Sequence, residues 1–136
     1  YPARGLAVGD YDNDGRIDVL VGLNLGAPLL LHNNAGKENH WLGVKLQGTR
    51  SNRDAVGAWL TWSANGVTRT RMHRGGGSYL SSHAAREVRG VGSATKVDWL
   101  EIKWPLPSGA VERFTDLPLD RYITIVEGQG RKVLAP

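Results

Sequence analysis

Residues 10–18 read DYDNDGRID, and their four aspartates recur in the spacing D-x-D-x-D-G-x-x-D. Three aspartates at alternate positions, followed by a glycine that permits a positive φ, can fold a short loop in which carboxylate oxygens point at one centre. Oxygen ligands of this kind suit a hard cation, and we expect calcium. The expected ligands are four carboxylates and one backbone carbonyl, contributed by Asp10, Asp12, Asp14, Asp18 and, through its carbonyl, Arg16.

The flanks of this loop argue against an EF-hand. An EF-hand loop needs a bidentate glutamate at its twelfth position, where this chain has Val21. Residues 6–8 and 17–21 are short apolar runs rich in β-branched side chains, so they predict strands and not helices. We therefore expect the loop to join two strands. An acidic turn that binds nothing is the weaker interpretation, because four neighbouring aspartates repel each other unless a cation lies among them.

The surrounding sequence, GLAVGDYDNDGRIDVLVG, resembles the calcium loop of FG-GAP or VCBS repeats, which form the blades of integrin-α-type β-propellers. The resemblance covers roughly residues 5–34, and LLLHNNAG matches the closing strand and turn of the repeat. It implies that residues 1–36 are a fragment of a propeller blade. Such blades have four strands, whereas this segment supplies about three, near residues 6–9, 17–23 and 29–31. A three-stranded fragment would leave its leucines and its outer strand edges exposed to solvent. We therefore expect it to fold back onto the rest of the chain or, less favourably, to pair with a second copy.

The length and composition allow one or two small domains. A chain of 136 residues can bury a hydrophobic core, and the lack of cysteine excludes disulfides and thiolate metal sites. No apolar run of eighteen residues is present, so we expect no membrane span. The first residue is Tyr1 and not Met, which suggests a processed chain or an excised piece. Together with the calcium loop, this favours an extracellular, periplasmic or outer-surface setting.

The charge is divided unevenly along the chain. Residues 1–36 carry a net charge of −2, whereas residues 37–136 carry +6. A basic second half favours acidic partners such as sulfated or uronic glycans, although a merely solvated basic surface is the simpler interpretation. Nucleic acid is disfavoured because no RNP-like strand or OB-type pattern is present. The candidate ligand surface combines arginines that could form one basic patch with tryptophans that could stack on sugars: Arg69, Arg71, Arg74, Trp59 and Trp62.

The second half predicts only strands. Residues 41–46 alternate in polarity, and residues 56–64 and 67–73 flank Asn65-Gly66, the strongest short signal for a hairpin. A two-residue turn there would pair Trp62 with Arg69, although it does not tell which face of the hairpin is buried. Further strands are expected at residues 87–91, 97–104, 111–114 and 122–126. No segment has a sustained period of 3.6 residues, so we predict an all-β protein.

This second half resembles the ASPIC/UnbV domain. The resemblance rests on HWLGVKLQG, SNRDAVGA, GGGSYLSS, VGSATKVDWLEIKWP and ITIVEG, in that order, over roughly residues 39–128. In secreted proteins of the cartilage acidic protein type this domain follows FG-GAP-type repeats, and the same order occurs here. The expected architecture is a partial blade with a calcium loop (residues 1–36) packed on a β-sandwich (residues 37–136). The resemblance carries over no catalytic residues, so we expect a non-catalytic module for adhesion or ligand recognition, whose partner is an acidic glycan or an extracellular protein.

The alternative is a hydrolase, for example one acting on glycans. Its carboxylates would have to come from Asp54, Glu87, Asp98 or Glu101. A triad of Ser78, Ser81 or Ser82 with His83 and Asp54 lacks the G-x-S-x-G elbow, and the run Gly75 to Gly77 lacks the lysine and helix of a phosphate loop. His32, His40, His73 and His83 lie too far apart in sequence to define a zinc site, and we expect them to be surface or half-buried residues.

Overall fold

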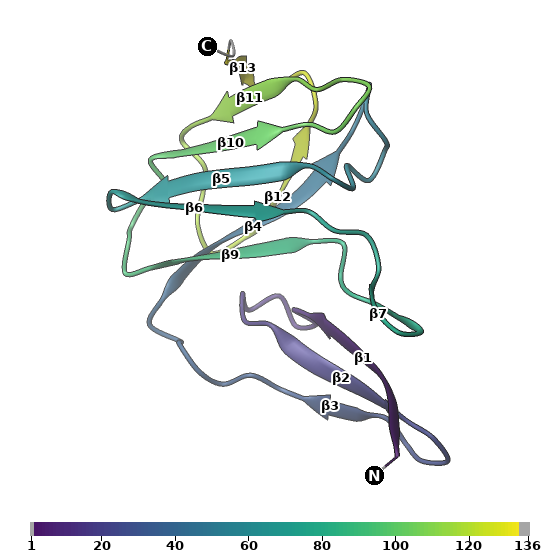
Figure 1. Ribbon diagram of the computed structural model, residues 1–136. Helices are drawn as coiled ribbons and strands as arrows, with labels where there is room; N and C mark the ends of the chain where they lie inside the picture. Colours follow the sequence, from purple (N-terminus) through teal and green to yellow (C-terminus); the bar gives the residue numbers. More distant parts are fainter. Residues whose placement is uncertain (1, 134–136) are drawn as a thin grey trace.

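The computed structural model describes residues 2–133, and these residues form strands and loops without helices, as predicted. Figure 1 shows a small N-terminal sheet below a larger domain. The N-terminal sheet is antiparallel, in the order β1-β2-β3, and its strands are β1 (Ala3–Gly9), β2 (Asp18–Leu23) and β3 (Leu29–Leu31). These are the three strands expected from the sequence, and the acidic loop joins the first two.

Two sheets make up the larger part, which we call the two-sheet domain. The five-stranded sheet has the order β13-β11-β10-β5-β6, from β5 (Trp59–Ala64), β6 (Val67–Met72), β10 (Trp99–Lys103), β11 (Val111–Phe114) and β13 (Arg131–Lys132). The three-stranded sheet has the order β12-β4-β9, from β4 (His40–Gln47), β9 (Glu87–Gly92) and β12 (Tyr122–Val126). A short hairpin, β7 (Gly77–Ser78) with β8 (Ser81–Ser82), projects toward the N-terminal sheet.

The two sheets enclose one hydrophobic core. Leu42 and Val44 of β4 pack in the same cluster as Leu60 of β5 and Leu100 and Ile102 of β10, and each of these side chains is fully buried. Alternate residues of a strand point to opposite faces, so these positions define the inner face of each sheet. The arrangement is a two-layered packing of open sheets.

The predicted hairpin is confirmed, and so is its register. Trp62 pairs with Arg69, and Leu60 pairs with Arg71. The question left open by the sequence, which face is buried, is settled by the opposite sheet: Leu60 and Trp62 face the core, whereas Trp59 is 47% exposed. The sequence missed β7, β8 and β13, because two-residue strands are too short to show any alternation.

The N-terminal sheet folds back onto the two-sheet domain. The outer edge of β1 is covered by the chain that follows β7: the Leu6 N–H donates to Ser81 Oγ at 3.0 Å, the Val8 N–H to His83 Nδ1 at 3.2 Å, and the Ala84 N–H to Val8 O at 3.0 Å. The backbone groups on this edge of β1 are therefore paired within the chain, without a second copy. The leucines of β2 and β3 remain partly in solvent all the same, with Leu30 at 49% exposure.

Candidate metal centre

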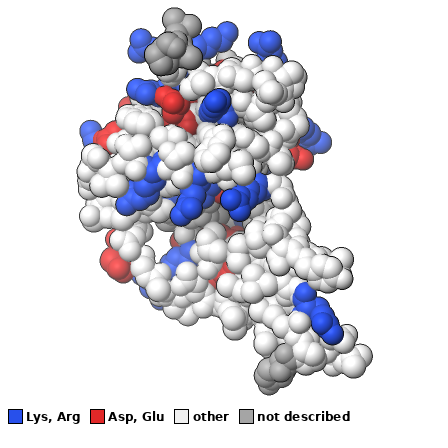
Figure 2. Space-filling model, viewed as in Figure 1, with Lys and Arg blue, Asp and Glu red and all other residues white. Residues whose placement is uncertain are grey.

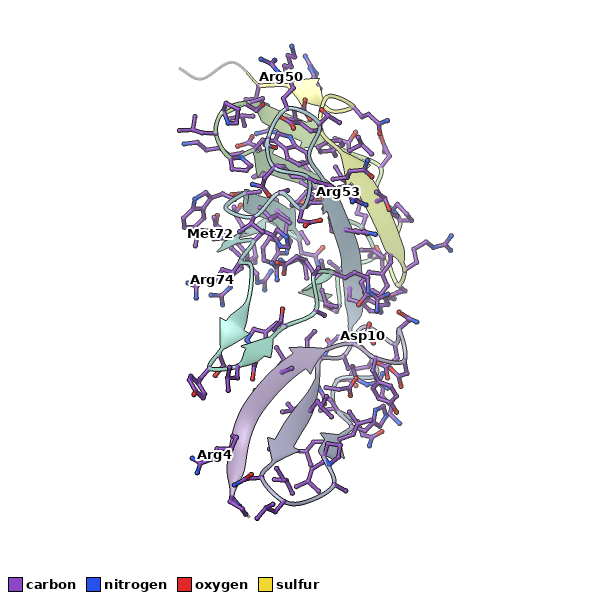
Figure 3. The ribbon with its side chains drawn as sticks, turned by 90° about the vertical axis from the view of Figure 1, so that its right-hand side faces the viewer. Arg4, Asp10, Arg50, Arg53, Met72 and Arg74 are labelled. Atoms are coloured by element: carbon purple, nitrogen blue, oxygen red, sulfur yellow. The ribbon has the colours of Figure 1, made fainter. Side chains whose placement is uncertain are left out.

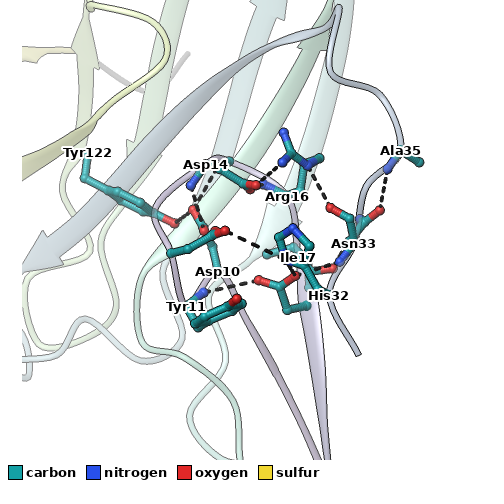
Figure 4. A network of polar contacts seen from close by, with 12 residues as sticks. Asp10, Tyr11, Asp14, Arg16, Ile17, His32, Asn33, Ala35 and Tyr122 are labelled. Carbon is teal, nitrogen blue, oxygen red and sulfur yellow. Dashed lines mark hydrogen bonds and ion pairs between the residues drawn. The ribbon is translucent and has the colours of Figure 1, made fainter. Parts of the chain in front are cut away.

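The aspartates of the acidic loop gather as the sequence predicted. Asp10, Asp12 and Asp14 each offer a carboxylate oxygen within 4.8 Å of the others, and Asp12, Asp18 and His32 form a second such group. Asp10 and Asp18 are 3% and 2% exposed, so both carboxylates are almost completely removed from solvent. Figure 4 shows the cluster between β2, the start of the loop and the segment after β3.

Asp10 holds the loop in shape. Its Oδ1 accepts the Asp14 N–H at 3.0 Å, and its Oδ2 accepts the Gly15 N–H at 2.9 Å and the Tyr122 hydroxyl at 2.6 Å. Burial raises the pKa of Tyr122, and its hydrogen bond to the negative Asp10 raises it further, so the tyrosine stays a donor. One side chain thus connects the loop to β12.

Asp18 holds the other side of the cluster. Its Oδ2 accepts the Tyr11 N–H at 3.3 Å and its Oδ1 accepts the Asn33 N–H at 2.8 Å, while His32 Nδ1 lies 3.2 Å from Oδ1. Burial by itself raises the pKa of Asp18, but the two backbone donors and the neighbouring histidine outweigh it and lower the pKa. Asp18 therefore remains a carboxylate at neutral pH.

Two further side chains complete the cluster. The Arg16 guanidinium forms an ion pair with Asp14 and donates from Nε to Asn33 O at 2.7 Å. Asp12 is different, because no hydrogen bond to its carboxylate is found in the described residues, and its nearest charged neighbour is His32 Nδ1 at 3.7 Å. Hard oxygen donors are what calcium prefers, and the Asp12 carboxylate has its coordination capacity unused. The donor set therefore fits calcium, in competition with Arg16 for Asp14.

The loop sits on the outer face of the β12-β4-β9 sheet. Gly15 has a φ of 81°, and a Cβ there would lie 2.2 Å from the Trp41 ring, so only glycine lets the loop approach this closely. Gly43 is restricted in the same way by Trp41 and Tyr122. Arg86 stacks 4.1 Å from the centre of the Tyr122 ring and donates to the backbone carbonyl of Asp10 at 3.0 Å.

Sequence reasoning missed four residues of this centre: His32, Trp41, Arg86 and Tyr122. Only His32 belongs to the repeat-like segment. The others come from up to 112 positions away, and no local pattern marks them. His32 was expected to be a surface or half-buried residue, and its side chain is indeed partly exposed, but the sequence did not indicate that it lies beside Asp12 and Asp18.

The candidate ligand surface is brought together only in part. Arg71, Arg74 and Trp59 line one groove, about 700 Å³ in volume, and Arg69 and Arg71 line the adjoining one, about 550 Å³. Trp62 also lines the second groove, but it is 4% exposed, so the expectation that it offers an open stacking surface was wrong. It faces the core because it shares the inner face of β5 with Leu60.

The residues considered for hydrolysis have other partners. Ser81 Oγ donates to Tyr79 O at 3.0 Å, and His83 Nδ1 accepts from Val8, so in the described residues no serine hydroxyl is bonded to the His83 ring. Of the four carboxylates, Asp98 accepts from Ser63 Oγ at 3.1 Å and Glu101 pairs with Arg113 at 2.8 Å. Glu87 lies in the 700 Å³ groove and Asp54 is exposed in a loop.

His73 was expected to be a surface or half-buried residue, and this was wrong. It is 3% exposed, with Nδ1 2.5 Å from Glu87 Oε1 and Nε2 3.0 Å from Asp54 O. Burial by itself raises the pKa of Glu87, but the contacts with His73 and Arg89 outweigh it and lower the pKa. The Arg89 guanidinium also pairs with Glu87.

Comparison with known protein families identifies the family to which most of the two-sheet domain belongs. Residues 48–132 match the ASPIC and UnbV family, and this is more than half of the chain. The chain belongs to the ASPIC/UnbV family. The match agrees with the resemblance seen in the sequence over roughly residues 39–128. It begins later, however, in the loop between β4 and β5, so it leaves out β4. The search of curated proteins found no match to this chain. The described residues of this ASPIC/UnbV chain include no helix with the length and apolar character needed to cross a membrane.

Proposed function

We propose that this chain is a non-catalytic, calcium-binding module for adhesion or ligand recognition outside the cytoplasm. In it, residues 1–36 act as a fragment of an FG-GAP or VCBS propeller blade, and calcium holds this fragment against the ASPIC/UnbV domain. The observation that carries the proposal is the convergence of Asp10, Asp12, Asp14 and Asp18, two of them almost fully buried, in a loop packed on β4 and β12.

Calcium would supply charge neutralisation among these carboxylates. The chain supplies the geometry: backbone donors orient Asp10 and Asp18, and the Tyr122 hydroxyl ties Asp10 to β12. A loop held in this way connects the metal to the contact between the two parts of the molecule. Calcium binding would then stabilise the position of the N-terminal sheet relative to the two-sheet domain.

The donor set also supports an extracellular setting. The loop has Val21 where an EF-hand has its bidentate glutamate, so it has fewer carboxylate oxygens than a tight site. Sites with fewer charged ligands bind calcium weakly, with dissociation constants of roughly 10⁻⁴ to 10⁻³ M in extracellular modules. Such a site is filled at the calcium concentration outside cells and not in the cytosol.

The test is a thermal unfolding series on metal-stripped protein with added calcium or magnesium. Asp12→Asn removes one carboxylate charge without removing a hydrogen bond within the described residues, so it should weaken the calcium response while the metal-free melting temperature changes little. Asp14→Ala should abolish the response. Asp54→Asn, which removes an exposed charge elsewhere, is the matched control. An unchanged melting temperature of the original protein at saturating calcium would contradict the proposal.

A further inference from the structure

A groove follows the open side of the two-sheet domain, where β6 and β9 are the edge strands of the two facing sheets. The pairing register puts Arg69 opposite Trp62 and Arg71 opposite Leu60, so both arginines share the inner face of their sheet with core residues. On β9, Arg89 pairs with Leu42 of the core in the same way. At these three positions the inner faces of the two edge strands carry charged side chains, whereas Val91, further along β9, belongs to the core.

The charges along this groove are not balanced. Its two adjoining parts are lined by five arginines: Arg69, Arg71, Arg74, Arg86 and Arg89. Glu87 is the one carboxylate among the described lining residues, and it is already engaged by His73 and Arg89. Within residues 2–133, no carboxylate lies at ion-pair distance from Arg69, Arg71 or Arg74. Figure 2 shows basic side chains in a row at the level of β6 and β9.

Two buried donors in the same groove have no protein partner. Trp62 Nε1 and Arg89 Nε are both buried, and neither has a hydrogen-bond partner among the described residues. Both residues line the 550 Å³ part of the groove, together with Arg69 and Arg71, and the Arg89 guanidinium lies 5.5 Å from the centre of the Trp62 ring. Buried polar groups are nearly always satisfied, so this pair needs an acceptor. A donor-rich site of this kind is suited to an anion.

We propose that this groove binds an acidic polysaccharide, with a sulfate or carboxylate group of the sugar held by Trp62, Arg69, Arg71 and Arg89. The groove continues past Arg71 to Arg74 and Arg86, which matches an extended ligand with repeated negative charges. Trp59 lines the continuation and exposes nearly half of its surface, and a sugar ring can stack on such a face. This inference rests on the proposed recognition role and names its ligand class.

The first test compares two double variants of equal charge. Arg69→Ser with Arg71→Ser removes two charges from the groove. Arg50→Ser with Arg53→Ser removes two exposed charges from the loop between β4 and β5, and neither residue lines the groove; both are labelled in Figure 3. Affinity for a heparin-derived octasaccharide is measured by calorimetry at two salt concentrations with calcium present. The groove variant should lose about tenfold or more in affinity, because charge-assisted bidentate contacts are lost, and the control about twofold or less. Equal losses in the two variants would overturn the proposal.

The second test reads the buried indole directly. Trp62→Phe keeps an aromatic ring but removes the unpartnered donor together with part of the indole volume, so it should weaken octasaccharide binding several-fold and also lower the stability of the core. Circular dichroism at the temperature of the titration checks that the variant is folded when its binding is measured. In the original protein, the indole N–H resonance that disappears in Trp62→Phe should shift on titration with the octasaccharide. A resonance that does not move contradicts the site, and equal affinity for polyglutamate of matched charge contradicts a sugar ligand.

The outcomes separate this inference from the proposed function. A calcium response with no groove-specific binding overturns the ligand inference alone. Groove-specific binding in a protein whose stability ignores calcium overturns the calcium role alone.

Discussion

The N-terminal sheet and the two-sheet domain bury their leucines to very different extents. Leu42, Leu60 and Leu100 of the domain are fully buried, whereas Leu20 and Leu30 of the N-terminal sheet are 46% and 49% exposed. The domain is held by apolar packing between two sheets, which is the dominant source of stability in most folds. The N-terminal sheet is held by polar contacts at its acidic loop and along the edge of β1. A small sheet without a core of its own thus depends on ion pairs and hydrogen bonds for its position.

Matched leucine substitutions test this contrast most severely. Leu100→Ala should destabilise the domain by about 2–5 kcal/mol, because it leaves a cavity in a fully packed core. Leu30→Ala should cost less than about 1 kcal/mol, because roughly half of its surface is already in water. Chemical denaturation of both variants measures the difference. Equal costs would mean that the N-terminal sheet is as tightly packed as the domain.

Calcium should act on the N-terminal sheet alone. Metal that binds only the folded state adds about 2.7 kcal/mol of stability at a hundredfold excess over its dissociation constant. Amide hydrogen exchange should therefore slow in β1, β2 and the acidic loop on adding calcium, while exchange in β5 and β10 stays the same. Equal slowing throughout both regions would show that the two parts unfold as one unit.

The two-sheet domain also contains a buried polar contact, made by the Glu127 carboxylate. Its Oε2 accepts the N–H groups of Thr49, Arg50 and Ser51 at 2.8–2.9 Å. Burial acts to raise the pKa of Glu127, but the hydroxyl and backbone N–H donors around its carboxylate lower it from 4.5 to about 2. Because the folded pKa is depressed, this stabilisation is present above pH 4.5 and is lost as pH falls toward 2.

Glu127→Gln should therefore cost about 1–3 kcal/mol at neutral pH, since the amide serves fewer of these donors, and should weaken the dependence of stability on pH below 4.5. Urea unfolding between pH 2 and 7 measures both effects. Glu38→Gln, at an exposed position, is the control. A variant with the original pH dependence would show that Glu127 does not titrate in this window.

Tyr122→Phe tests the contact between the two regions, with a smaller expected effect than Glu127→Gln. It removes the hydroxyl that donates to Asp10 at 2.6 Å and keeps the ring against Trp41 and Arg86. The loss should be about 1–2 kcal/mol for the N-terminal sheet, as for a hydrogen bond to a charged acceptor, and near zero for the domain. Proteolysis at the acidic loop should become faster. An unchanged cleavage rate would show that the sheet is held mainly by the edge of β1.

Local signals in the sequence determined the strands, the hairpin and the acidic loop. Asn65-Gly66 sets the turn and therefore the register of β5 and β6, because a two-residue loop leaves no freedom in the pairing. Alternation and turn residues marked the main strands, and the spacing of the four aspartates marked the loop, because each of these properties is encoded within about ten neighbouring residues.

Only the tertiary structure decided the contacts that join distant segments. The parallel pairing of β4 with β12, the Tyr122 contact with Asp10 and the burial of His73 against Glu87 depend on how the sheets stack. Which face of the hairpin is buried was decided by β4, since a period of two marks two faces without telling which one meets a partner. Arg69 and Arg71 therefore became part of a groove, and Trp62 part of the core, because a second sheet packs on one side of β5 and leaves the edge strand β6 open.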